Sequence, residues 1–94
     1  MEIKQAAPQR IVILAYPATI GGTEQAQDIA TFLLKAGIPS VEWGSFLDQP
    51  LVERVEQGEF DLLVALGGDG TMLRAGHLCA PLGMPFVGVN LGRF

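Results

Sequence analysis

The apolar positions of this chain fall into short continuous runs, and segments with helical spacing separate them. Continuous runs predict strands that are buried on both faces, which is typical of a parallel sheet covered by helices. Strands of this kind are expected at residues 10–16, 61–66 and 85–89, and a short strand is expected at residues 40–43.

Apolar residues at helical spacing predict three helices between these strands. The first should have Thr23 as its N-cap and end at Gly37, because glycine at that position stops a helix. A weaker second helix is expected over residues 48–58, with Arg54 and its other charged side chains facing solvent. The third is expected over about residues 72–79, directly after a glycine-rich loop.

Strands that alternate with helices over short connections predict an α/β fold. We expect a three-layer, Rossmann-like domain with a mostly parallel sheet and helices on both faces. At 94 residues the chain has room for one such domain. Ligands of these sheets bind beyond the carboxyl ends of the strands, so we expect the site in the loops at residues 16–22, 67–71 and 90–93.

Composition narrows the choice of partners. The formal net charge is −4 and no run of Lys or Arg is present, which argues against nucleic acid or a membrane surface as the main partner. No stretch approaches the ~18 consecutive apolar residues that span a bilayer. The single cysteine, Cys79, lies in an apolar helical pattern, so we expect a buried thiol and a cytoplasmic protein. Trp43 and Phe46 are expected in the core or at an interface.

The most informative segment is Gly67-Gly68-Asp69-Gly70-Thr71, which joins the third strand to the third helix. Its glycines allow a tight turn and a close approach of the backbone to a ligand, and Thr71 is expected to cap the helix. Free N–H groups at a helix N-terminus bind anions such as phosphate. Asp69 would repel a phosphate, so we expect it to contact a metal ion or to accept a proton from an attacking hydroxyl group.

This loop matches neither of the two common phosphate-binding fingerprints. The dinucleotide fingerprint would need glycine at position 73, which is leucine, and no P-loop sequence occurs in the chain. The structural alternative is an Asp-Gly turn in a β-hairpin, which that dipeptide favours. The helical spacing after Thr71 argues for the strand-to-helix interpretation instead.

Three further polar residues lie near this loop in the predicted fold, and each has a structural alternative. Arg74 follows Asp69 by five residues and is equally typical of a solvated helix surface. His77 is more typical of a helix surface than of a ligand set, and no metal-ligand spacing is present, so we expect no metal site built by the protein. Asn90 follows the fourth strand, where asparagine is also common in ordinary turns.

Two segments together resemble the ATP-NAD kinase family. The first is Gly67-Gly68-Asp69-Gly70-Thr71 with Met72-Leu73, and the second is Gly88-Val89-Asn90-Leu91-Gly92. The first element alone is shared with diacylglycerol and sphingosine kinases, and its Gly-Gly-Asp-Gly core also occurs in phosphofructokinases. The second segment favours the NAD kinases, because the Gly-Thr-Gly-Asn-Asp type of segment found in lipid kinases is absent. The resemblance is strongest over residues 62–94.

The resemblance implies phosphoryl transfer from ATP, or from polyphosphate, to the 2′-hydroxyl of the adenosine ribose of NAD, giving NADP. Asp69 would accept the hydroxyl proton and contact the ribose. A divalent cation such as Mg²⁺ would be held by the phosphates of ATP rather than by a protein cage. The positions that would bind NAD or line the phosphate loop are Gly67, Gly68, Gly70, Thr71, Arg74 and Asn90.

Residues 1–94 would then form the N-terminal α/β domain of such an enzyme. We expect a C-terminal domain, which holds much of the NAD in this family, to lie beyond this chain. The 94 residues alone should therefore have little or no kinase activity, and the full-length protein should be a homo-oligomer, either a dimer or a tetramer. Two alternatives stay open: a related lipid or sugar kinase, and a non-catalytic nucleotide-binding module with a flavodoxin-like arrangement.

Overall fold

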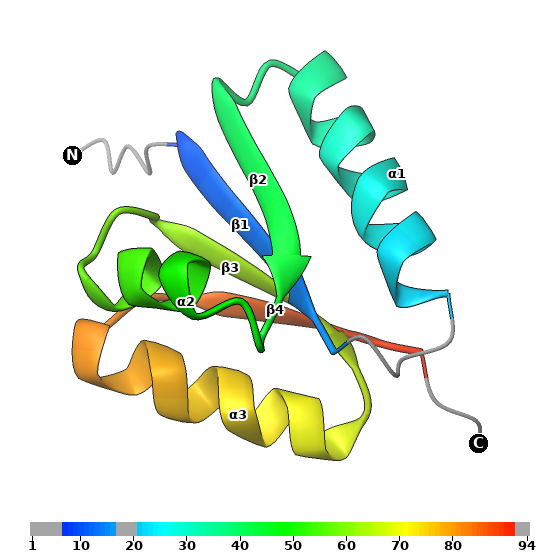
Figure 1. Ribbon diagram of the computed structural model, residues 1–94. Coiled ribbons are helices and arrows are strands. Elements are labelled where there is room, and N and C mark those ends of the chain that lie inside the picture. The colour runs from blue at the N-terminus through cyan, green and yellow to red at the C-terminus, as the bar shows by residue number, and fades with distance from the viewer. Residues whose placement is uncertain (1–6, 17–20, 92–94) are drawn as a thin grey trace, which may run out of the picture.

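The computed structural model describes residues 7–16 and 21–91, and its strands and helices follow the predicted order (Figure 1). The strands are β1 (Arg10–Ala15), β2 (Ser40–Ser45), β3 (Leu62–Gly67) and β4 (Phe86–Asn90). The helices are α1 (Gly22–Lys35), α2 (Gln49–Glu56) and α3 (Asp69–Cys79), with a 3-10 turn, η1 (Ala80–Leu82), after α3. Within the described ranges, none of the helices is long and apolar enough to cross a membrane.

All strand pairs are parallel, and their order across the sheet is β2-β1-β3-β4. The register places Ala15 beside Ser45 and Leu66, and it places Gly67 beside Asn90. The carboxyl ends of all four strands therefore share one edge. Only β1 and β3 are buried along nearly their whole length. The prediction of a buried strand is wrong for β4, which lies at an edge of the sheet and is mostly exposed.

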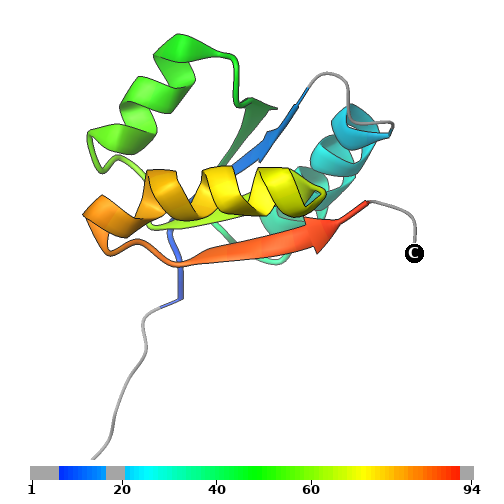
Figure 2. The same ribbon diagram turned by 90° about the horizontal axis from the view of Figure 1, so that it is seen from below.

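Helices cover both faces of the sheet and give the predicted three layers. Figure 1 shows α1 on one face and α2 with α3 on the other, and Figure 2 shows α3 lying along β4. Ala26 and Ala30 of α1 share one apolar cluster with Ile13 of β1. The opposite cluster includes Cys79, which is 1% exposed as predicted. Burial raises the pKa of the Cys79 thiol, so the thiol stays protonated at neutral pH.

Two of the three helices begin at residues other than those predicted. The N-cap of α1 is Gly21, with a φ of 77°, instead of Thr23. The helix α3 begins at Asp69 instead of near Met72, because its first turn is built from the glycine loop and carries no apolar pattern. The helix α2 begins within one residue of its predicted start at residue 48. Asp48 is its N-cap, and the carboxylate accepts a hydrogen bond from the Leu51 N–H at 3.3 Å.

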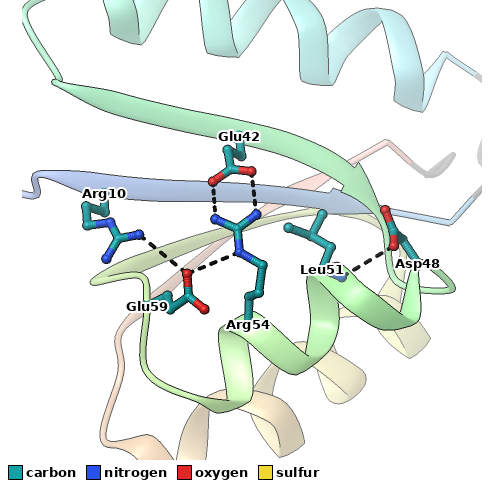
Figure 3. Close-up of polar contacts among 6 residues, drawn as sticks. All are labelled: Arg10, Glu42, Asp48, Leu51, Arg54 and Glu59. Carbon is teal, nitrogen blue, oxygen red and sulfur yellow. Dashed lines mark hydrogen bonds and ion pairs between the residues drawn. The ribbon is translucent and has the colours of Figure 1, made fainter.

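Arg54 of α2 is half-buried and paired, so the prediction of a solvent-facing side chain is wrong. Its guanidinium donates hydrogen bonds of 2.7 and 2.6 Å to Glu42 and one of 3.1 Å to Glu59 (Figure 3). Arg10 lies 3.6 Å from the same Glu59 carboxylate, and both guanidinium groups lie over the ring of Phe60. The hydrogen bonds from Arg54 hold the pKa of Glu42 below its usual value.

Candidate functional site

The connection between β3 and α3 is reduced to one residue, Gly68, which is the N-cap of α3. Gly67 before it has a φ of 156°, and a Cβ added there would lie 2.7 Å from the Cβ of Thr71, so this position requires glycine. Thr71 is 8% exposed and packs behind the turn from within the helix. The prediction that Thr71 caps the helix is therefore wrong, and so is the β-hairpin alternative.

The first turn of α3 has backbone N–H groups with no partner inside the helix. The first bond of the helix runs from the Met72 N–H to the Gly68 carbonyl at 3.1 Å. The N–H groups that precede it belong to Asp69, Gly70 and Thr71. Together with the positive end of the helix dipole, such groups favour an anion. A Cβ at Gly68 or Gly70 would meet no atom within 4 Å, so this cradle faces open space.

Asp69 is the first residue of α3, and its side chain is exposed. A carboxylate at this position interacts favourably with the helix dipole, by about 0.3–1 kcal/mol at an exposed site. The aspartate therefore has a structural role beside the expected chemical one. Within residues 7–16 and 21–91, no hydrogen bond or ion pair engages its side chain. The carboxylate stands at the open cradle and is available to a ligand.

The structure separates Arg74 and His77 from Asp69 along α3. Arg74 is exposed and lies about 7.5 Å further along the helix axis, about 140° around it. Among the described residues, none forms an ion pair with its guanidinium. His77 is exposed, as its surface interpretation predicts, and borders a cavity of about 170 Å³ with Glu56 and Pro81. This cavity lies away from the glycine loop.

The end of β4 brings the second motif beside the glycine loop. Asn90 is in register with Gly67, and the Leu91 N–H donates a hydrogen bond of 3.0 Å to the Gly67 carbonyl. Gly88 allows β4 to approach α3 closely, because a Cβ there would overlap a side chain of that helix. The expectation that the two motif segments meet at the carboxyl edge is confirmed. Gly92, the last residue of the second motif, lies outside the described residues.

A separate cavity of about 160 Å³ opens where β1 and β2 end, and Tyr16 and Gly22 of the predicted site loop at residues 16–22 border it. Trp43, expected in the core or at an interface, is 40% exposed and borders this cavity. Phe46 is buried and stacks on Tyr16, with ring centroids 5.0 Å apart. Residues 17–20 of the predicted site loop lie outside the described residues. The lining consists of Ala15, Tyr16, Gly22, Thr23, Ala26, Trp43, Gly44 and Ser45.

Comparison with known proteins gives a family match over the region that carries both motifs. The ATP-NAD kinase N-terminal domain matches residues 38–94. Over 86 residues the chain is 35% identical to an NAD kinase of Chloroflexus aurantiacus (strain ATCC 29366 / DSM 635 / J-10-fl), covering 89% of this chain and 30% of the relative. Over 58 residues it is 48% identical to an NAD kinase of Heliobacterium modesticaldum, covering 61% of this chain and 20% of the relative.

A solved structure supports the fold independently. The chain resembles a "putative diacylglycerol kinase" from Bacillus anthracis str. Sterne, with a TM-score of 0.65 and 18% identity. The similarity covers 92% of this chain and 32% of that one, and at such low identity it shows the fold alone. The chain spans less than a third of the length of the curated relatives described above.

Proposed function

The chain belongs to the ATP-NAD kinase family, and from this premise we propose that it is the N-terminal domain of an enzyme that phosphorylates NAD. The acceptor is the 2′-hydroxyl of the adenosine ribose, the donor is ATP or polyphosphate, and the product is NADP. One observation carries this proposal. The hydrogen bond from Leu91 to Gly67 holds the two motif segments side by side, next to the open cradle and Asp69.

The proposed reaction moves one phosphoryl group between two oxygens. With ATP as donor, the ribose 2′-oxygen forms a bond to the γ-phosphorus while the bond from that phosphorus to the β–γ bridging oxygen breaks, and ADP leaves. The hydroxyl proton passes to the carboxylate of Asp69. Such transfer depends mainly on positioning and charge neutralisation. A carboxylate that accepts the proton contributes about 10²–10⁴-fold to the rate.

The remaining motif residues position the substrates in this proposal. Gly67, Gly68 and Thr71 shape the phosphate loop, and Asn90 binds nucleotide from the neighbouring strand end. Gly70 and Arg74 contact NAD. Gly70 supports this assignment, because glycine destabilises a helix relative to alanine by up to about 1 kcal/mol and the site has room for a Cβ. A close approach of ligand to the backbone accounts for glycine at this position.

We assign a divalent cation such as Mg²⁺ to the phosphates of ATP. In the part of the chain that the structure describes, no group of three His, Cys, Asp or Glu side chains is arranged to hold an ion. Asp69 is the acidic side chain at the cradle, and its position fits an ion that arrives with the nucleotide. When bound, the ion neutralises charge on the transferring phosphate.

The intact protein is proposed to extend beyond this domain. Because the curated relatives are more than three times as long as the matched segment, we assign the rest of the NAD site to a C-terminal domain. The 94 residues alone should then form little or no NADP. We also propose that the intact enzyme is a cytoplasmic homo-oligomer, either a dimer or a tetramer.

The substrate class is tested on the intact protein by measuring phosphorylation of NAD, of a diacylglycerol and of a sugar. We expect NADP to form with ATP or with polyphosphate, and the two donors are compared in parallel. Phosphorylation of the lipid or the sugar alone would establish the related kinase instead. Nucleotide binding with no transfer to any acceptor would establish a non-catalytic module.

The role of Asp69 is tested with Asp69→Asn in the intact protein. Turnover should fall by about 10²–10⁴-fold, because the amide cannot accept the hydroxyl proton, while NAD binding should weaken only moderately. The matched control is Glu53→Gln, which neutralises an exposed acid on α2 and should leave turnover near the wild-type value. Near-normal turnover of Asp69→Asn would show that another group is the base.

A further inference from the structure

The packing of α3 on β4 depends on two glycines, one in each element. The two elements lie side by side and run in opposite directions (Figure 2). The ring of Phe86 in β4 lies over Gly76 of α3, where an added Cβ would be 3.9 Å from the ring atom Cε1. In the reciprocal contact, the side chain of Met72 in α3 lies over Gly88 of β4. Each element therefore leaves a gap, at a glycine, for a large side chain of the other.

The contact at Gly88 is much tighter than the contact at Gly76. A Cβ added at Gly76 would be at an ordinary van der Waals distance from Phe86. A Cβ added at Gly88 would overlap the Sδ atom of Met72 and would lie 3.2 Å from its Cε and 3.5 Å from its Cγ. Glycine weakens a strand, because it has no side chain to pack and loses more conformational entropy on folding. The close packing of Met72 therefore accounts for glycine at position 88.

The contact between Met72 and Gly88 lies next to the candidate site on both elements. Gly68, the N-cap of α3, lies one helical turn before Met72. Asn90 follows Gly88 by two residues and lies on the same face of β4. Four residues of a helix span about 6 Å and two residues of a strand about 6.6 Å, so the two steps are nearly equal. The register agrees, because Asn90 pairs with Gly67, the residue before Gly68.

Met72 connects this contact directly to the phosphate cradle. Its N–H donates the first hydrogen bond of the helix, to the Gly68 carbonyl at 3.1 Å. Its backbone therefore belongs to the turn that exposes the cradle N–H groups, while its side chain packs on Gly88 of β4. A shift of Met72 on Gly88 would move the cradle relative to Asn90.

We propose that Met72 and Gly88 are positioning residues, which set the distance between the phosphate cradle and Asn90. This inference rests on the proposed function, since it concerns how the two halves of that site are aligned. Neither residue touches the reacting atoms. They act through the first turn of α3 and the end of β4, and a misplacement on the order of 1 Å between reacting groups lowers the rate by up to about 100-fold.

The proposal is tested with Gly88→Ala in the intact protein, and Gly76→Ala is the matched control. Both variants add one methyl group to the same contact between helix and strand, and only Gly88→Ala crowds Met72. The kcat per folded molecule should fall by about 10–100-fold in Gly88→Ala, because Met72 is displaced from its gap. The KM for the phosphate donor should change by less than about threefold, since each half of the site still binds its group. Gly76→Ala should keep the wild-type kcat, and an unchanged kcat in Gly88→Ala would overturn the proposal.

A compensating substitution distinguishes positioning from other reasons for a glycine. Met72→Val keeps an atom near the place of the Cγ, which is 3.5 Å from the added methyl group, and it lacks the Sδ and Cε atoms. The double variant Met72→Val/Gly88→Ala should therefore regain most of the lost kcat, because volume removed from the helix is returned on the strand. If a ligand approached Gly88 instead, the double variant would stay as impaired as Gly88→Ala, and the proposal would be wrong.

Two further comparisons cover the other outcomes. If Gly88→Ala alone does not fold, the double variant is compared with Met72→Val, which leaves the gap partly empty and should have the lower kcat. Equal values would contradict the proposal. Loss and recovery of kcat with an acceptor other than NAD would contradict the proposed function and support the positioning roles. NADP formation with the same kcat in all variants would do the reverse, and nucleotide binding without any transfer would overturn both.

Discussion

The two ends of the sheet use charged residues in opposite ways. Toward the amino ends of the strands, Arg54 bridges Glu42 and Glu59, and Arg10 joins the same network (Figure 3). Both guanidinium groups lie over the ring of Phe60. At the carboxyl ends, within the described residues, the charged groups of Asp69 and Arg74 pair with no other side chain.

This difference separates charges that hold the fold together from charges that remain available to a ligand. At the amino end, charged side chains of the protein pair with one another, so they need no ligand as a partner. At the carboxyl end, the N–H groups of the first turn of α3 and the carboxylate of Asp69 lie open beside Asn90. Polar groups that are oriented but unpaired are what a site for phosphate and ribose requires.

Asp69→Asn should give the largest effect, and it should act mainly on turnover. A loss of about 10²–10⁴ in turnover is expected, whereas the free energy of unfolding should fall by no more than about 1 kcal/mol, the value of a charge at a helix N-terminus. Urea unfolding is measured beside the kinetics of the intact protein. A large loss of stability would place Asp69 among the structural charges and remove the contrast between the two ends.

Comparing Gly67→Ala with Gly70→Ala should distinguish a glycine that is needed for packing from one that is needed for ligand binding. The added Cβ of Gly67→Ala meets Thr71, so the protein should lose about 1–3 kcal/mol of unfolding free energy. Gly70→Ala has room for its Cβ and improves helix propensity, so stability should rise by up to about 1 kcal/mol. NAD affinity should nevertheless fall in Gly70→Ala. Unchanged affinity, measured by calorimetry, would show that the ligand does not approach Gly70.

Arg54→Met should have a smaller effect, and it should act on stability alone. The replacement leaves Glu42 and Glu59 without their shared partner, so the midpoint of thermal unfolding should fall, though by less than in Gly67→Ala. Turnover per folded molecule should stay at the wild-type value, because the network lies at the opposite end of the sheet. A matching loss of turnover would mean that the two ends are coupled.

The smallest expected effect is on the acid dependence of stability. Arg54 lowers the pKa of Glu42 in the folded protein, mainly through its hydrogen bonds. The stabilisation is therefore complete above the unfolded-state pKa of about 4.3, and it is lost as the pH falls through the lower folded-state pKa. The free energy of unfolding is measured with urea between about pH 3 and pH 6. As the pH falls, it should decrease more steeply in the wild type than in Arg54→Met. Superimposable profiles would show that the pair contributes no pH dependence.

Much of the candidate site could be predicted from the sequence, because its signals are local. Glycines that permit a tight turn, an acid beside them and a following helical pattern all lie within residues 67–79, and the structure confirms a strand-to-helix turn there. The predicted start of α3 was wrong, because its first turn, Asp69, Gly70 and Thr71, contains no apolar periodicity. Trp43 was expected in the core or at an interface, and it is 40% exposed on the outer strand β2, since a pattern does not tell which strand lies at the edge of a sheet.

The sequence by itself determined the order of strands and helices, their parallel arrangement and the glycine-rich segment that we propose binds phosphate. Each of these depends on periodicity or on backbone freedom within a few neighbouring residues. Only the tertiary structure decided that β1 and β3 are central, that Arg54 meets Glu42, and that Val87 of β4 is half exposed beside the buried Val64. These features depend on contacts between residues far apart in the chain. Because many alternative pairings bury similar apolar area, local patterns do not choose among them.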